Sequence, residues 1–63
     1  MKVKPVHSIE DDCYRVYIIS EGLRQQVGSD FFYTKENQEE KWISCLNYAK
    51  EIEDQLEYYK EKD

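Results

Sequence analysis

The chain has few of the residues from which catalytic and metal sites are usually built. Its 63 residues include one histidine, two cysteines, two glycines and one proline. Cys13 and Cys45 form no Cys-x-x-Cys pair, and one histidine does not complete a zinc site with them. Gly22 and Gly28 form no phosphate-binding loop, and a lone strand histidine such as His7 is more typical of packing than of catalysis. We therefore expect no catalytic, cofactor or metal site, and we do not expect an enzyme.

Long apolar runs are also missing. The N-terminus carries Lys2 and Lys4 before Pro5 and lacks the apolar core of a signal peptide. No apolar run approaches the length of a membrane-spanning helix. We expect a cytoplasmic protein, in the host cytoplasm if it is viral. Buried reduced thiols are then expected at Cys13 and Cys45, with one disulfide between them as the alternative.

The residues that are present favour a folded chain. Hydrophobic residues make up 40% of the sequence and aromatic residues 14%, against 37% charged residues. A chain of this size lies near the lower limit for folding without disulfides, metals or association. Tyrosine is frequent, with six residues, and aromatic side chains often anchor interfaces between proteins. Association with a partner is therefore a reasonable expectation.

One long helix is predicted over residues 34–62. Thr34 is a favourable N-cap, and no proline or glycine follows it to interrupt a helix. Apolar side chains recur at alternating spacings of three and four, which is the seam of an amphipathic helix. These residues are Trp42, Cys45, Ala49, Ile52, Leu56 and Tyr59. Ile43 and Leu46 are expected to widen the seam where the helix lies on a sheet.

Residues 1–33 are predicted to form a three-stranded antiparallel meander. Residues 1–9 alternate as an edge strand that contains Pro5, and residues 13–20 have the β-branched and aromatic composition of a central strand. Glu21-Gly22 is a two-residue hairpin signal. Gly28-Ser29-Asp30 interrupts the third strand as a bulge or as a turn, and we favour one bent strand. The expected fold is α+β, with a meander (1–33) and one C-terminal helix (34–62) in a single domain, 1–63.

The helix is predicted to be longer than the sheet that covers it. A helix of this length extends about 42 Å, whereas strands of six or seven residues reach about 20–23 Å. Ile52, Leu56 and Tyr59 would then form an uncovered stripe. The stripe would pair with a second copy in a homodimer, dock in a groove of another protein, or belong to a bent or frayed end. The residues expected at a dimer or partner interface are Ile52, Leu56, Tyr59, Ala49, Tyr17 and Ile19.

Negative charge is concentrated in the second half of the chain. The formal net charge is −5, and residues 35–63 carry nine acidic side chains against five lysines. Such a surface repels nucleic acid and favours partners with a basic surface. The expected acidic face consists of Glu36, Glu39, Glu40, Glu51, Asp54, Glu57 and Glu61.

These features favour a small acidic protein-interaction module. Its size and charge are similar to those of phage-encoded inhibitors of host or defence proteins, some of which mimic DNA with rows of carboxylates. One alternative is a structural homodimer with its function on the sheet. Another is a weak nucleic-acid binder, because the layout resembles the DNA-binding sheets of some integrase and plant transcription-factor domains. That binder would use Lys4, Arg15, Tyr17 and Arg24.

Overall fold

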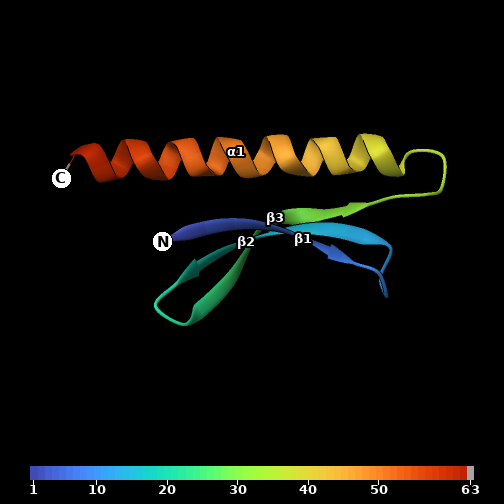
Figure 1. The fold of residues 1–63 in the computed structure, drawn as a ribbon, viewed down its shortest axis with the longest axis horizontal. Helices are drawn as coiled ribbons and strands as arrows, with labels where there is room; N and C mark the ends of the chain where they lie inside the picture. Colours follow the sequence, from blue (N-terminus) through green and yellow to red (C-terminus); the bar gives the residue numbers. More distant parts are fainter. Residues whose placement is uncertain (63) are drawn as a thin grey trace.

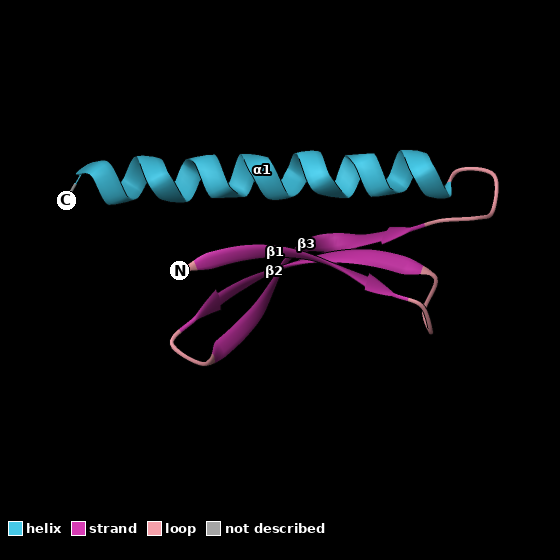
Figure 2. Ribbon diagram, in the orientation of Figure 1, coloured by secondary structure: helices cyan, strands magenta, loops and turns pink. Residues whose placement is uncertain are grey.

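A three-stranded sheet with one long helix across one of its faces makes up the protein (Figures 1 and 2). The computed structural model describes residues 1–62, with side chains for residues 1–56. The elements are β1 (Lys2–Ser8), β2 (Cys13–Ser20), β3 (Leu23–Phe32) and α1 (Gln38–Lys62). Neighbouring strands are antiparallel, in the order β1-β2-β3. The predicted α+β fold, a βββα meander and helix, is confirmed.

The β2–β3 hairpin is closed by the two residues that the sequence indicated. Ser20 pairs with Leu23, which leaves Glu21 and Gly22 as the turn. Their φ angles are +46° and +84°, and a type I′ turn requires positive φ at both central positions. This turn matches the right-handed twist of the two strands that it joins.

The third strand is bent by a bulge, as favoured from its sequence. Tyr14 pairs with Phe31, but Val16 pairs with Val27, so Arg15 alone faces residues 28–30 of β3. Gly28 adopts a φ of +76°, which is readily accessible to glycine. Residues 23–32 therefore form one continuous strand, and the sheet has three strands in the described part of the chain.

The helix begins four residues later than predicted. The Lys41 amide donates to the Asn37 carbonyl over 3.0 Å, so Asn37 is the residue that flanks the first helical turn. The Asn37 side-chain oxygen accepts the Thr34 backbone N–H at 2.7 Å and holds the preceding turn in place. The expectation that Thr34 is the N-cap is therefore wrong, because residues 35–37 form a turn before the helix.

Small residues of the helix lie against the centre of the sheet. Cys45 and Ala49 are 0% and 6% exposed and pack with Val16 and Tyr14 of β2. Their short side chains let the helix approach the sheet closely, and larger partly buried side chains surround this core. These side chains are Val3, Val27, Phe31, Tyr33, Trp42 and Tyr48.

Of two apolar helix residues that were expected on the sheet, Ile43 faces away from it and Leu46 lies on the flank of the helix. A helix turns about 100° per residue, so with Cys45 facing the sheet, Ile43 lies about 200° around the helix and Leu46 about 100°. They are 50% and 39% exposed. The prediction that they widen the buried seam is therefore wrong.

The free end of the helix is better covered than predicted. Figure 1 shows the C-terminal end of α1 extending past the sheet. Ile52 and Leu56 are nevertheless half-buried, so the expected stripe is not left bare at these two positions. The side chain of Tyr59 lies outside the described residues. Ala49 belongs to the core, and its side chain is therefore not available to a partner.

Candidate interaction surfaces

His7 belongs to an aromatic cluster that joins the sheet to the start of the helix. Its Nε2 lies 2.5 Å from the Tyr33 hydroxyl, and its ring centroid is 4.5 Å from that of Tyr14. Tyr14 also packs against Trp42, with ring centroids 4.9 Å apart, and its hydroxyl accepts a hydrogen bond from Gln38. The rings pack directly against one another, and the His7 Nε2 and the hydroxyl groups of Tyr14 and Tyr33 are hydrogen-bonded. This arrangement supports packing at His7.

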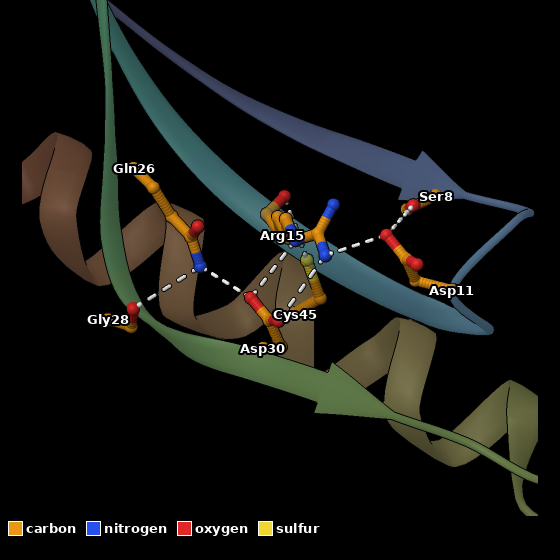
Figure 3. A network of polar contacts seen from close by, with 7 residues as sticks. All are labelled: Ser8, Asp11, Arg15, Gln26, Gly28, Asp30 and Cys45. Carbon is orange, nitrogen blue, oxygen red and sulfur yellow. Dashed lines mark hydrogen bonds and ion pairs between the residues drawn. The ribbon is translucent and has the colours of Figure 1, made fainter.

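A polar network lies on the other face of the sheet, at the bulge (Figure 3). Arg15 donates through Nε to Asp30 and through Nη2 to Asp11, both at 3.0 Å. The Gln26 amide donates to the same Asp30 oxygen at 2.6 Å, and Ser8 donates to Asp11 at 3.1 Å. The network therefore connects all three strands around the irregular pairing.

The electrostatics of this network favour the charged forms of its members. Hydrogen bonds from Arg15 and then Gln26 lower the pKa of Asp30, and the bonds to Asp30 and Asp11 raise the pKa of Arg15. Cys13 lies on the same face and is fully buried, and burial raises the pKa of its thiol. Because Arg15 is held by two carboxylates, it is poorly placed to bind a phosphate group. The expected role of Arg15 in nucleic-acid binding is therefore disfavoured.

The face of the sheet away from the helix carries basic side chains around one tyrosine. Val3 and Val16 pack toward the helix, so their strand neighbours point away from it. The guanidinium carbon of Arg24 lies 4.6 Å from the centre of the Tyr17 ring, which is a cation–π distance. We call this surface the basic sheet face and define it by Lys2, Lys4, Tyr17, Ile19 and Arg24. Among the described residues, no ion pair joins its three cations to a carboxylate.

The side of the helix away from the sheet has an apolar centre. Ile43 and Leu46 are three positions apart, so their side chains are neighbours on the helix surface. We call this side the helix outer face and define it by Ile43 and Leu46 together with the exposed carboxylates around them. These carboxylates are Glu39, Glu40, Glu51, Glu53 and Asp54, and an exposed cation, Lys50, lies on the same face beside Leu46.

The predicted row of carboxylates is divided rather than continuous. Glu36 precedes the helix, and the side chains of Glu57 and Glu61 lie outside the described residues. Eleven positions separate Glu40 from Glu51, which is about 16 Å along the helix axis. A DNA strand carries one phosphate about every 3.4 Å along its axis. The interval between the two acidic groups contains the apolar pair, so the face resembles a protein-docking surface more than a strand of phosphates.

Sequence reasoning missed the exposed position of this apolar pair, although the helical spacing contained the signal. The seam through Cys45 and Ala49 already fixed which side faces the sheet, and Ile43 and Leu46 are out of phase with it. Of the residues expected at an interface, Tyr17 and Ile19 lie half-buried on the basic sheet face. The sequence had placed Tyr17 and Ile19 in one interface group with Ile52 and Leu56 of the helix. The structure places the two strand residues on the face of the sheet away from the helix.

The disulfide that the sequence left open as an alternative is not formed. Both cysteines are free and lie on opposite sides of β2, since Cys45 donates to the Arg15 carbonyl from the helix side. The described side chains, those of residues 1–56, include no group of three metal-ligating residues, and no helix in the described part of the chain is long and apolar enough to cross a membrane. Neither models of known protein families, nor curated proteins, nor solved structures provide a match to this chain.

Proposed function

We propose that the protein is a small interaction module that binds a larger protein through the helix outer face. The observation that carries the proposal is the exposure of Ile43 and Leu46 at the centre of a polar helix surface. Burying a fully exposed side chain of this kind is worth about 1.5–3 kcal/mol, and because Ile43 and Leu46 are 50% and 39% exposed, roughly half of this is available at each. A partner that covers both residues supplies burial that the sheet of the same chain does not.

The surroundings of the apolar pair fit the usual anatomy of an interface. Energetically important contacts lie near the centre, and polar side chains around them exclude water. Glu39 and Glu40 lie on the N-terminal side of the pair, and Glu51 and Asp54 lie on its C-terminal side, where Lys50 is the one exposed cation among the described side chains. The fitting partner surface is therefore an apolar depression with basic side chains at its two ends.

Charge orients the helix outer face toward its partner and raises the association rate. Acidic groups at both ends of the helix face steer it toward a basic surface, and this attraction weakens as salt screens it. The helix is presented on a small sheet, so it is already formed before binding and little ordering is required. The module acts by occupying the surface of its partner, as an inhibitor does.

Comparison of matched variants tests the proposal. The immobilised protein, the double variant Ile43→Ser/Leu46→Ser and the control Leu23→Ser are used to capture proteins from the same extract. Leu23 is 76% exposed in the hairpin, away from the helix. We expect a protein that wild type and Leu23→Ser retain and that the double variant binds at least about tenfold more weakly, since central interface residues cost more than 1 kcal/mol when truncated.

Two further measurements make the result decisive. The double variant must retain the free energy of unfolding of the wild type within about 0.5 kcal/mol, because both residues are exposed. Binding to the purified partner must also weaken in high salt. A partner that the double variant binds as tightly as the wild type contradicts the proposal.

A further inference from the structure

The two broad faces of the molecule carry opposite charge. Lys2, Lys4 and Arg24 lie on the basic sheet face, and the exposed carboxylates of α1 lie on the far side of the helix. A helix diameter of about 10 Å separates these carboxylates from the sheet. That distance exceeds the Debye length of about 8 Å at physiological ionic strength. A group that approaches this face therefore meets four cations, Lys2, Lys4, Arg15 and Arg24, against the two carboxylates of Asp11 and Asp30 that hold Arg15, which is a local excess of positive charge.

The basic sheet face is also left uncovered by its own chain. Figure 1 shows the helix on one side of the sheet only, with the two hairpin turns at opposite ends of the strands. Tyr17 and Ile19 supply apolar surface between the cations, and Arg24 lies over the ring of Tyr17. The face therefore combines an apolar strip with three cations, and its chemistry complements that of the helix outer face.

We propose that the basic sheet face binds the helix outer face of a second copy of this chain. Lys4 and Arg24 of one copy would lie near Glu51 and Asp54 of the next, and Ile43 and Leu46 would contact Tyr17 and Ile19. The three strands are about 14 Å wide and accommodate a helix about 10 Å in diameter. In this arrangement the sheet has a helix on each face, one from its own chain and one from the neighbour.

The geometry predicts a weak contact that joins the copies into open chains rather than closed dimers. Two different surfaces meet, so each bound copy exposes a further basic sheet face and a further helix outer face. The sheet face measures about 14 by 23 Å, or roughly 300 Å², whereas a stable interface buries about 800 Å² on each partner. Association is therefore expected only at high protein concentration and low salt, as chains of graded length.

Self-association would also regulate partner binding. The helix outer face is the surface assigned to the partner under the proposed function, and it is covered in every copy of a chain except one. The self-association is nevertheless independent of the identity of that partner. Variants of the sheet face change it without altering Ile43 and Leu46.

Sedimentation velocity on complementary charge variants tests the inference. The first variant, Lys4→Glu/Arg24→Glu, replaces two cations of the basic sheet face with carboxylates, and the second, Glu51→Lys/Asp54→Lys, replaces the helix carboxylates that would face Lys4 and Arg24 with cations. At low salt the mass of the wild type is expected to rise above 7.7 kDa between micromolar and millimolar protein. It should return to the monomer value in about 1 M salt, where the Debye length is about 3 Å. Each variant alone is expected to stay monomeric.

The mixture of the two variants gives the decisive result. An equimolar mixture is expected to associate at least as strongly as the wild type, because the carboxylates introduced in one variant then face the cations introduced in the other. Circular dichroism establishes that both variants are folded, and Lys35→Glu, in the turn before α1, serves as a charge control.

Three results would overturn the inference. The first is a wild type that stays monomeric at every concentration, and the second is a mixture that stays monomeric. The third is self-association that Lys4→Glu/Arg24→Glu preserves, which would indicate pairing between helices. If a monomeric wild type instead binds labelled single-stranded DNA through Lys4 and Arg24, the occupant of the sheet face is nucleic acid. Loss of self-association in the first variant with retained partner binding leaves the proposed function intact.

Discussion

Gly28 lies beneath the ring of Tyr48, where a helix side chain meets the backbone of the bulge. A β-carbon at this position would lie 2.6 Å from Tyr48 Cε2 and 2.7 Å from the hydroxyl oxygen. The ring has Phe31 as a second neighbour, with centroids 5.9 Å apart, and this contact limits its movement. The missing side chain of Gly28 is therefore part of the contact between helix and sheet.

Gly28→Ala is expected to destabilise the protein more than Gly22→Ala. Both glycines have positive φ, and an L-residue there costs about 1–2 kcal/mol. Gly22 has no atom within 4 Å of the added carbon, so only this backbone cost applies to it. Overpacking adds about 1–3 kcal/mol at Gly28. Urea denaturation of both variants measures the difference.

Tyr48→Ala provides the control for this comparison. In that background the cost of Gly28→Ala should fall to the cost of Gly22→Ala, because the clashing ring is gone. Equal costs for the two glycine substitutions in the wild-type background would contradict the assigned contact.

Asp30 contributes stability that depends on pH. Its pKa is lowered in the folded protein by Arg15 and Gln26, so the ionised form is favoured by folding. This contribution is complete above the ordinary aspartate pKa of about 3.9 and is lost as the pH falls through the lowered value. The melting temperature of the wild type should therefore exceed that of Asp30→Asn near neutral pH, and the difference should shrink below about pH 4.

Thermal unfolding of both proteins between neutral and acidic pH checks this expectation. Glu51→Gln, a change at an exposed helix carboxylate without an ion pair among the described residues, serves as the control. A difference between wild type and Asp30→Asn that stays constant with pH would show that the ion pair is not the cause.

At the scale of the elements, the start of the helix is set by Asn37 and its neighbours. Asn37 accepts the Thr34 amide with its side chain and the Lys41 amide with its backbone carbonyl. Glu40 follows Asn37 by three residues, which is the spacing of a capping box. The turn of residues 35–37 allows the chain to reverse between β3 and α1, as Figure 2 shows.

Asn37→Ala should therefore cost about 0.5–1.5 kcal/mol, the usual net contribution of one intramolecular hydrogen bond, because it removes the acceptor of the Thr34 N–H. Thr34→Ala should be nearly neutral, because the backbone N–H of Thr34, rather than its side chain, makes the observed bond. Chemical denaturation monitored by circular dichroism distinguishes the two. A larger loss from Thr34→Ala than from Asn37→Ala would restore Thr34 as the cap.

The strands could be predicted from sequence because their signals are local. Glu21-Gly22 specifies a turn, and residues 13–20 have the composition of a central strand. The bounds of β2 match the prediction, and the bulge at Gly28 was favoured over a turn. The orientation of Ile43 and Leu46 depends instead on which helix face meets the sheet. These two residues were assigned to the core because they are hydrophobic. Cys45 and Ala49 are the residues that face the sheet, and their positions around the helix leave Ile43 and Leu46 exposed.

The candidate surfaces were predicted less well, because they depend on contacts between distant residues. Arg15 looks like a free cation in the sequence, but the bulge brings Asp30 beside it. Of the predicted acidic residues, Glu36 lies in the turn before the helix and the others lie within α1, whereas the division of their row by two apolar side chains appears only once the outer face is known. Folding therefore decides which charges remain available to a partner.

At the scale of the whole molecule, very few side chains are buried. Among residues 1–56 these are Cys13, Tyr14, Val16, Cys45 and Ala49. A domain of this size has a small margin of stability, and a three-stranded sheet needs an apolar layer against it to persist. We therefore expect the helix and the sheet to unfold together rather than in steps.

The two buried cysteines make this cooperativity measurable. Cys13 lies under the polar network on the open face of the sheet, and Cys45 lies between the sheet and the helix. Burial raises the pKa of both thiols, so each reacts with a thiol reagent only after its own surroundings open. Mass spectrometry of the labelled sites is expected to give equal rates. Faster labelling of Cys45 would mean that the helix lifts away while the sheet survives.

Cys13 and Cys45 lie on opposite sides of β2, so their labelling rates report separately on the opening of the two faces of the sheet. Cys45 becomes accessible when the helix separates from the sheet, and Cys13 becomes accessible when the polar network on the open face of the sheet is disrupted. Because both are natural residues, the order in which the layers open can be read in the unmodified sequence. The same pair reports on binding, since a partner that holds the helix against the sheet must slow the labelling of Cys45.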